Sequence, residues 1–138
     1  ARGAFAHLTL GAALGDLYRA ILEALTFALR ENLEFLGRYG MTMQMIRSIG
    51  GGAKSDLWLQ MKADVTGLPV DRPVNTEAAV MGAAMLAAAG AGVFPDVAAS
   101  AGAFYRSARI FEPDPETHAR YAEPYRRYLA LYRMLSAP

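Results

Sequence analysis

One stretch, residues 16–36, is apolar around most of a helical circumference and constrains the fold more than any other feature. Its charged side chains recur at steps of three, four, seven and four residues, so they share one narrow stripe of a helix. A helix with so narrow a polar face is buried on more than one side. The pattern therefore predicts a long helix that neighbouring elements cover. The stripe consists of Asp16, Arg19, Glu23, Arg30 and Glu34.

Composition narrows the class of protein. The 138 residues are enough for one domain, and the net charge of +1 gives no reason to expect a nucleic-acid partner. The chain has no cysteine, which excludes disulfides, cysteine nucleophiles and cysteine-ligated metals. The two histidines, His7 and His118, form no local metal motif. We therefore expect no metal site in this chain, and the cysteine content is compatible with the cytoplasmic location that we expect.

A second helix is predicted by the run of small apolar residues at 78–89. Asn75 or Thr76 is a suitable N-cap for it, and Gly90 ends it. The run is about half of the ~20 residues that a bilayer-spanning helix requires. We expect a buried, closely packed helix and no membrane segment.

Shorter patterns predict the remaining elements. Pro124 either lies in the first turn of the last helix or divides that helix in two. A tyrosine stripe along the last helix is interpreted as a docking face. The alternation of strands and helices predicts an α/β fold, helix-rich with a small sheet that contains parallel strands. We expect strands at 4–10 and 43–49, an edge strand at 68–70, and helices at 55–67 and 116–135. Ser55 is the expected N-cap of the helix 55–67 and Gly67 its C-terminal cap. This helix and the one at 78–89 are expected to flank the glycines at 50–52.

The segment from Gly50 to Ser55 carries the most chemical information. A predicted strand enters it and a predicted helix leaves it, and its three glycines allow a ligand to approach the backbone closely. The start of the following helix favours an anion, and Lys54 adds a cation. The segment is neither a Walker A loop nor a GxGxxG loop, because Ala53 and Ser55 stand where glycines are required. Two interpretations stay open, a nucleotide loop and an ordinary tight turn.

The carboxylates predict no catalytic pair. Asp56 and Asp64 are eight residues apart on the predicted helix 55–67, which is about 12 Å along its axis. Because this distance is too great for paired acid/base work, we interpret each as a solvated or capping charge. Glu77, at a helix start, is interpreted as interacting with the helix dipole, and His7 as packed within its strand. We expect no catalytic residue in this chain.

Three stretches together resemble the C-terminal part of the FGGY carbohydrate kinases, most closely the xylulokinase-like members. Residues 1–32 resemble the family's second signature, although His7 stands where the family usually has glycine. Residues 48–70 resemble its adenosine-binding segment, and 77–96 the Glu-Ala-x-x-x-Gly-Ala-Ala helix that follows. The ending, 109–132, resembles the xylulokinase tail. The matching positions of the first stretch are Gly3, Phe5, Leu8, Asp16, Leu17, Ala20 and Glu23.

The resemblance implies part of a ribonuclease-H-like, actin-type ATPase domain. Family members transfer the γ-phosphate of MgATP to a sugar or polyol hydroxyl in a cleft between two domains, of which the C-terminal one holds most of the nucleotide. Gly50, Gly51 and Gly52 match the loop that approaches the ribose and phosphates. Ser55 aligns with an adenine-contacting Asn of some members, and Ala53 completes the expected ATP-binding set.

The resemblance also implies what this chain lacks. In the family the catalytic Asp and the sugar contacts lie in the N-terminal domain, and the early phosphate-binding loops precede the matching segment. The opening, Ala1-Arg2-Gly3, has no initiator methionine and no signal-peptide pattern. We therefore expect residues 1–138 to be the C-terminal, nucleotide-binding portion of a sugar kinase, inactive by itself. By resemblance the expected sugar is a xylulose-like ketose.

A second hypothesis is a non-catalytic interaction module. In that case the apolar helices would be buried against a partner or a second copy of the chain, because an incomplete domain associates through its exposed apolar surface. A specific response to adenine nucleotide distinguishes the two hypotheses.

Overall fold

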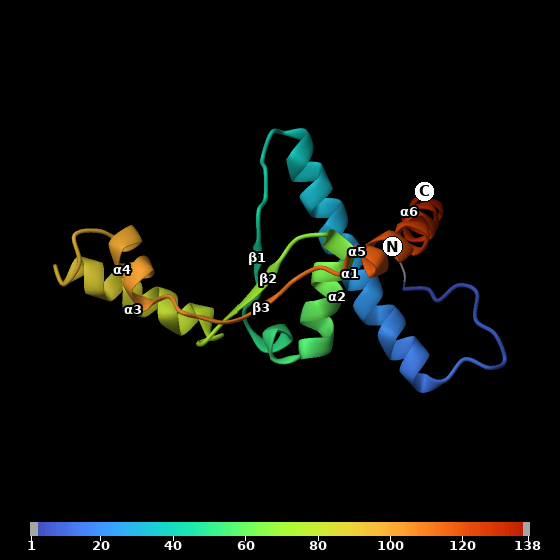
Figure 1. The fold of residues 1–138 in the computed structure, drawn as a ribbon, viewed down its shortest axis with the longest axis horizontal. Helices are drawn as coiled ribbons and strands as arrows, with labels where there is room; N and C mark the ends of the chain where they lie inside the picture. Colours follow the sequence, from blue (N-terminus) through green and yellow to red (C-terminus); the bar gives the residue numbers. More distant parts are fainter. Residues whose placement is uncertain (1–2, 137–138) are drawn as a thin grey trace.

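The computed structural model describes residues 3–136, which form a three-stranded sheet and the helices around it (Figure 1). The strand order is β1-β2-β3, with β1 parallel and β3 antiparallel to β2. The α/β, helix-rich prediction with parallel strands is therefore confirmed. The strands are β1 (Ile46–Arg47), β2 (Val70–Pro73) and β3 (Ser107–Phe111). The helices are α1 (Leu14–Arg38), the 3₁₀ turn η1 (Gly51–Lys54), α2 (Asp56–Thr66), α3 (Ala78–Gly90), α4 (Val97–Phe104), α5 (Pro115–Arg120) and α6 (Ala122–Ser136).

The long helix α1 forms where its pattern predicts, extended by two residues at each end. Its polar stripe makes two internal ion pairs, Arg19 with Glu23 and Arg30 with Glu34, each at 2.9 Å. Burial, however, is confined to one side of the helix, around Leu22, Thr26 and Phe27. The expectation of cover on more than one side is wrong for this chain, because α2 and α6 pack against one face and leave Ile21, Leu25 and others exposed.

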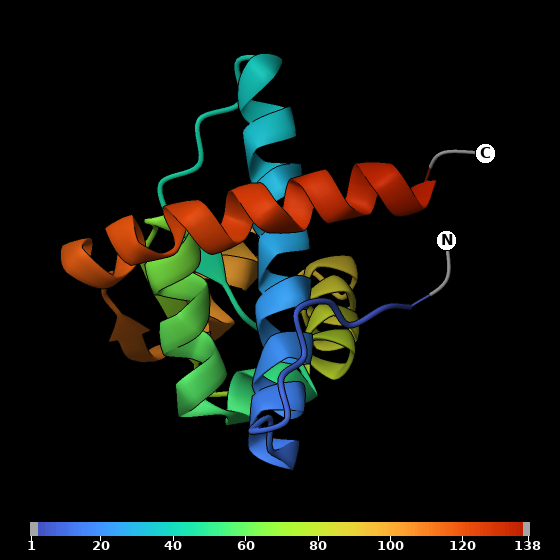
Figure 2. The same cartoon turned by 90° about the vertical axis from the view of Figure 1, so that its right-hand side faces the viewer.

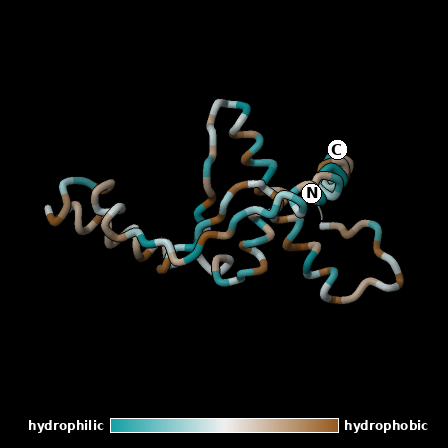
Figure 3. The backbone as a smooth tube through the Cα atoms, in the orientation of Figure 1, coloured by the Kyte–Doolittle hydropathy of each residue, from teal (hydrophilic) through white to brown (hydrophobic). Residues whose placement is uncertain are grey.

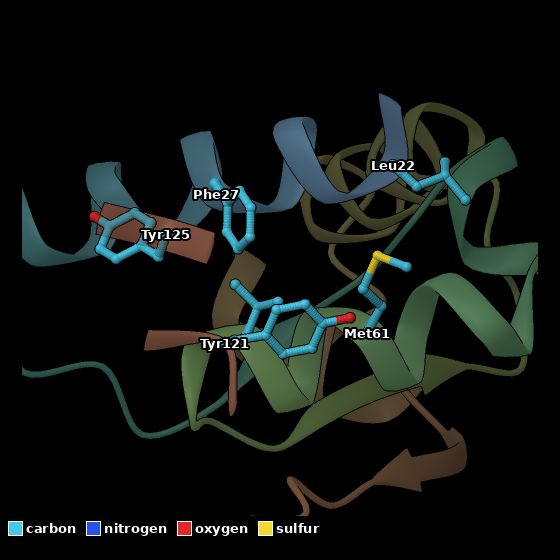
Figure 4. Close-up of a cluster of buried hydrophobic side chains, with 6 residues drawn as sticks. Leu22, Phe27, Met61, Tyr121 and Tyr125 are labelled. Carbon is cyan, nitrogen blue, oxygen red and sulfur yellow. The ribbon is translucent and has the colours of Figure 1, made fainter. Parts of the chain in front are cut away.

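The main core lies where α6 crosses α1 beside α2 (Figure 2). Phe27 is the centre of an aromatic cluster: its ring centroid lies 5.9, 5.7 and 5.5 Å from those of Tyr121, Tyr125 and Tyr128. Met61 of α2 joins the cluster from below (Figure 4). The tyrosine stripe is thus a docking face, as interpreted, and its partner within this chain is α1.

The last predicted helix is divided in two. Helix α5 ends at Arg120, and α6 begins at Ala122 after Tyr121. Pro124 lies in the first turn of α6, where a missing backbone N–H costs nothing. The predicted helix is thus divided in two, and Pro124 also lies in a first turn, that of α6.

The sheet packs one face against α2 through a second cluster of Leu59, Ala63, Val70 and Phe111. Strand β2 is central, so the prediction of an edge strand at 68–70 is wrong in position and in role. The reason is β3, whose antiparallel pairing no sequence pattern predicted. Buried Asp71 reinforces this pairing by accepting hydrogen bonds from the hydroxyls of Tyr105 and Ser107.

Residues 4–10, which the structure describes, form no strand. A strand needs a pairing partner, and this segment is exposed along its whole length, with Leu8 and Leu10 facing solvent. His7 adopts φ 58° and is exposed, so its interpretation as a packed strand residue is also wrong.

Helices α3 and α4 form an arm that projects from the sheet (Figure 1). The two helices pack on each other, with the Ser100 hydroxyl donating to the Met85 carbonyl at 3.1 Å. None of the residues of α3, all of which the structure describes, is buried. The expectation of a buried helix at 78–89 is therefore wrong here, because α4 covers one side of α3 and leaves the rest of an apolar helix open (Figure 3).

The open arm, the open face of α1 and the exposed segment before it all add to the accessible surface. The chain exposes 9285 Å², about 2,300 Å² more than the roughly 7,000 Å² expected of a compact monomer of 14.9 kDa. Among residues 3–136, no helix is long and apolar enough to cross a membrane.

Candidate functional site

The glycine-rich segment forms a tight connection between β1 and α2. Gly50 adopts φ 71° and ψ −163°, a conformation essentially restricted to glycine. Its N–H donates to the Thr76 carbonyl at 2.8 Å, and its own carbonyl accepts from the Ala53 N–H at 3.1 Å. The connection is thus a 3₁₀ turn whose shape depends on Gly50 and which is tied to the segment before α3.

Two backbone donors of this turn are free. Within residues 3–136, the N–H groups of Gly51 and Gly52 donate to no other group, as is usual for the first residues of a helical turn. A Cβ added to Gly51 would meet no atom within 4 Å. The turn therefore offers two adjacent amides and open space above Gly51 to a ligand.

The other predicted site residues lie around the turn in supporting positions. Ala53 is fully buried, so its methyl group packs beneath the turn. The Ser55 hydroxyl accepts a hydrogen bond from the Trp58 N–H at 3.3 Å and caps α2, as predicted. In addition, Asp56 in the first turn of α2 pairs with Arg72 and Arg109 at 2.5 and 2.7 Å. Ser55 and Asp56 therefore stabilise the start of α2 directly behind the turn.

Helices α2 and α3 flank the turn, as expected. The N-cap of α3 is Glu77, so the predicted caps, Asn75 and Thr76, both lie before it. The side-chain oxygen of Asn75 accepts a hydrogen bond from the Glu77 N–H at 2.9 Å. Lys54 Nζ lies 3.9 Å from Glu77 Oε1, and both side chains are exposed. This weak ion pair bridges the turn and the start of α3 at the surface.

A groove of about 400 Å³ begins beside the turn, a size within the range of small-molecule sites. It lies on the sheet face opposite α2, because Ile46 packs towards α2 and the next residue, Arg47, points the other way. No sequence pattern indicated this groove, since α4 and the two residues that follow it, Tyr105 and Arg106, contribute to its lining and α4 was not predicted. Its lining includes Ile49, Val74, Asn75, Met81 and Phe104, with Arg47 and Arg106.

The two carboxylates of α2 have separate structural roles. Asp64 is buried and accepts hydrogen bonds from the Asp114 N–H and the Gln60 amide, each at 2.9 Å. Asp56 forms the exposed arginine cluster. The interpretation as a solvated or capping charge fits the exposed Asp56 in the first turn of α2 and is wrong for Asp64, which is buried because it accepts hydrogen bonds from the segment before α5 and from its own helix. Among the residues that the structure describes, no three His, Asp or Glu side chains gather in a group that could hold a metal.

Lys62 is a charged group beside Trp58 that no sequence pattern indicated. Its ammonium donates to the buried Ser48 hydroxyl at 2.9 Å and lies 4.4 Å from the Trp58 ring centroid. Burial lowers the pKa of Lys62 below its ordinary value. The charged form is therefore less favourable in the folded state than in the unfolded chain.

This shift predicts a pH-dependent difference in stability. Because the folded-state pKa lies below the unfolded one, the cost of burying Lys62 is complete at neutral pH. It is relieved as pH rises through the folded-state pKa towards about 10.4. We expect Lys62→Met to raise the free energy of unfolding at pH 7, and this advantage to shrink as pH rises, in urea titrations of both proteins. The exposed Lys54→Met is the control, and an equal pH trend in that variant would contradict the assignment.

Comparison with known proteins shows which family has this arrangement. Residues 1–91 match the family model described as "FGGY family of carbohydrate kinases, C-terminal domain". A xylulose kinase of Staphylococcus epidermidis is 38% identical over 132 residues, which are 96% of this chain and 27% of that protein. A ribulokinase of Mycolicibacterium smegmatis is 41% identical over 125 residues, which are 90% of this chain and 22% of that protein.

Solved structures agree. The crystal structure of xylulose kinase from Rhodospirillum rubrum matches with a TM-score of 0.84 and 34% identity, over 98% of this chain and 28% of that one. The architecture is accordingly that of the actin-like ATPase fold of sugar kinases, and the chain spans about a quarter of the length of the relatives it matches. The matched residues and the shared fold show that this chain belongs to the FGGY family of carbohydrate kinases.

Proposed function

We propose that this chain is the nucleotide-binding portion of an ATP-dependent sugar kinase, which transfers the γ-phosphate of ATP to a sugar hydroxyl. Membership of the family supports the reaction class. The observation that carries the proposal is the turn after β1, where Gly51 and Gly52 present free amides and nothing fills the space above Gly51. Backbone amides in such a turn suit phosphate or ribose oxygens.

Each residue of the turn has a distinct role in this proposal. Gly50 sets the backbone shape, Gly51 and Gly52 face the nucleotide, and Ala53 and Ser55 hold the turn from beneath and behind. Lys54 is exposed at the rim and supplies positive charge. The described residues offer no carboxylate cluster for Mg²⁺, so we assign no Mg²⁺ ligand to this chain and propose that the ion accompanies ATP.

The catalytic base and the sugar contacts are assigned to a part of the kinase outside these residues. Phosphoryl transfer depends on groups positioned on both sides of the transferred phosphate, and we propose that this chain supplies one side and is inactive alone. The relatives named above are a xylulose kinase and a ribulokinase. A xylulose-like ketose is the substrate we propose, and we also propose a cytoplasmic location, where ATP is available as the donor.

A thermal-shift titration with MgADP tests the proposal, with MgGDP as the control nucleotide. A ligand that binds the folded state alone adds about 2.7 kcal/mol at a hundredfold excess over Kd, so we expect a clear rise in Tm with MgADP. Gly51→Leu should abolish this rise and keep the ligand-free Tm, because its side chain enters space that no residue occupies. A cooperative melt with no response to MgADP, or an equal response to MgGDP, would contradict the proposal.

The excess exposed surface favours a second function, association through the α3–α4 arm. On the arm this surface includes the exposed apolar side chains Val80, Leu86, Val93 and Val97, and exposed apolar surface of this kind marks interaction sites. Sedimentation velocity over a range of concentrations measures this association. Gly51→Leu should leave it unchanged, because Gly51 lies outside the arm.

A further inference from the structure

Trp58 supports the glycine turn from below. A Cβ added to Gly52 would lie 2.8 Å from Trp58 Cζ3, closer than real Cβ contacts come, and 3.3 Å from Cε3, which is tighter than most. The backbone N–H of Trp58 also donates to the Ser55 hydroxyl at the end of the turn. The indole edge therefore sets how closely the Gly51–Gly52 backbone can approach α2.

The indole is itself held in one orientation by α1. Trp58 Nε1–H donates to Thr26 Oγ1 at 3.0 Å, and the Thr26 hydroxyl donates to the Leu22 carbonyl at 2.7 Å. Thr26 is 1% exposed, so this hydroxyl is reserved for the two partners. On the other side, Lys62 Nζ lies 4.4 Å from the ring centroid. The ring is thus fixed by hydrogen bonding and packing, and free rotation under the turn is excluded.

We propose that Trp58 is a positioning residue that aims the free amides of Gly51 and Gly52 at the nucleotide, and that Thr26 of α1 acts on the site through the indole. This inference rests on the proposed nucleotide-binding function. The path runs from the Leu22 carbonyl through Thr26 and Trp58 to Gly52, so the long helix α1 contributes to affinity without touching the ligand.

The first test compares two substitutions of Thr26, a residue outside the proposed binding set. Thr26→Val removes the acceptor for the indole N–H, whereas Thr26→Ser keeps a hydroxyl. We expect Thr26→Val to weaken MgADP binding about fivefold to tenfold, the size of one lost hydrogen bond, and Thr26→Ser to restore affinity. Calorimetric titration gives Kd, and thermal unfolding of the same samples gives stability. A lower Tm in Thr26→Val with an unchanged Kd would overturn the inference.

The second test is a double-mutant cycle between Gly52→Ala and Trp58→Leu. In the presence of the indole, the added methyl group must displace the turn, so Gly52→Ala should weaken MgADP binding. With Trp58→Leu the methyl group has room, so the same substitution should cost clearly less affinity. Additive effects would show that the indole does not set the turn and would overturn the inference.

The outcomes separate this inference from the proposed function. If the unsubstituted chain does not bind MgADP, the proposed function fails, and the positioning role fails with it. If the unsubstituted chain binds MgADP but the Thr26 pair and the cycle show no coupling, the positioning role alone is wrong. Because Trp58 is the only tryptophan in the sequence, its fluorescence reports whether the indole environment changes in each Thr26 variant.

Discussion

Phe27→Ala is expected to lower the free energy of unfolding by about 3–5 kcal/mol, the usual cost of removing a buried aromatic ring. Phe27 is 5% exposed and packs against three tyrosine rings within 6 Å. These rings pack α1 against Tyr121 and α6, so the substitution leaves a cavity at the centre of the main core. Urea unfolding followed by circular dichroism measures the change.

Phe35→Ala on the same helix is the matched control. Phe35 is 52% exposed, and surface substitutions of this kind change stability by within about 0.5 kcal/mol. If the two variants lost stability equally, the packing of α6 on α1 would not be the main source of stability in this chain. A selective loss in Phe27→Ala together with loss of α6 protection in hydrogen exchange would confirm it.

Gly50→Ala is expected to cost about 1–3 kcal/mol in stability and to abolish MgADP binding. The cost arises because a side chain at φ 71° and ψ −163° is strained whatever space surrounds it. Relief of this strain changes the backbone at the start of the turn and turns the free amides of Gly51 and Gly52 away. Urea unfolding measures the first effect, and calorimetric titration with MgADP measures the second.

Gly51→Ala is the control that distinguishes backbone strain at Gly50 from the effect of adding a methyl group to the turn. Gly51 does not have a positive φ, and an added Cβ meets nothing within 4 Å, so its stability should change by within about 0.5 kcal/mol. Equal destabilisation by the two alanines would contradict the special role of the Gly50 backbone. Full MgADP affinity in Gly50→Ala would contradict the placement of the ligand at the turn.

Local signals in the sequence were sufficient for the helices and turn that carry their own caps. Ser55 begins α2 and Gly67 ends it in the left-handed conformation, as the pattern predicted. The glycine-rich turn between β1 and α2 was predicted by its residues alone, and the structure adds that Gly50 carries the unusual backbone angles. Such features depend on residues that are close in the sequence, so a sequence pattern is sufficient to predict them.

Those local signals could not predict which distant strands pair with each other. Strand β3 follows β2 by more than thirty residues of helix and loop, and its register with β2 rests on Asp71, Tyr105 and Ser107. Residues 4–10 have the composition of a strand and remain unpaired. A strand exists through hydrogen bonds to a partner, so composition predicts a tendency and the partner decides the outcome.

The sequence by itself therefore determined the long helix α1, the capped helix α2, the glycine turn between β1 and α2, and a resemblance specific enough to predict the family. Tertiary structure alone decided that β2 is central, that the α3–α4 arm stands open, and that Thr26 reaches the turn through Trp58. The physical reason is the range of the interactions. Caps and glycine conformations act within a few residues, whereas burial and strand pairing depend on which distant segments are present to cover a surface.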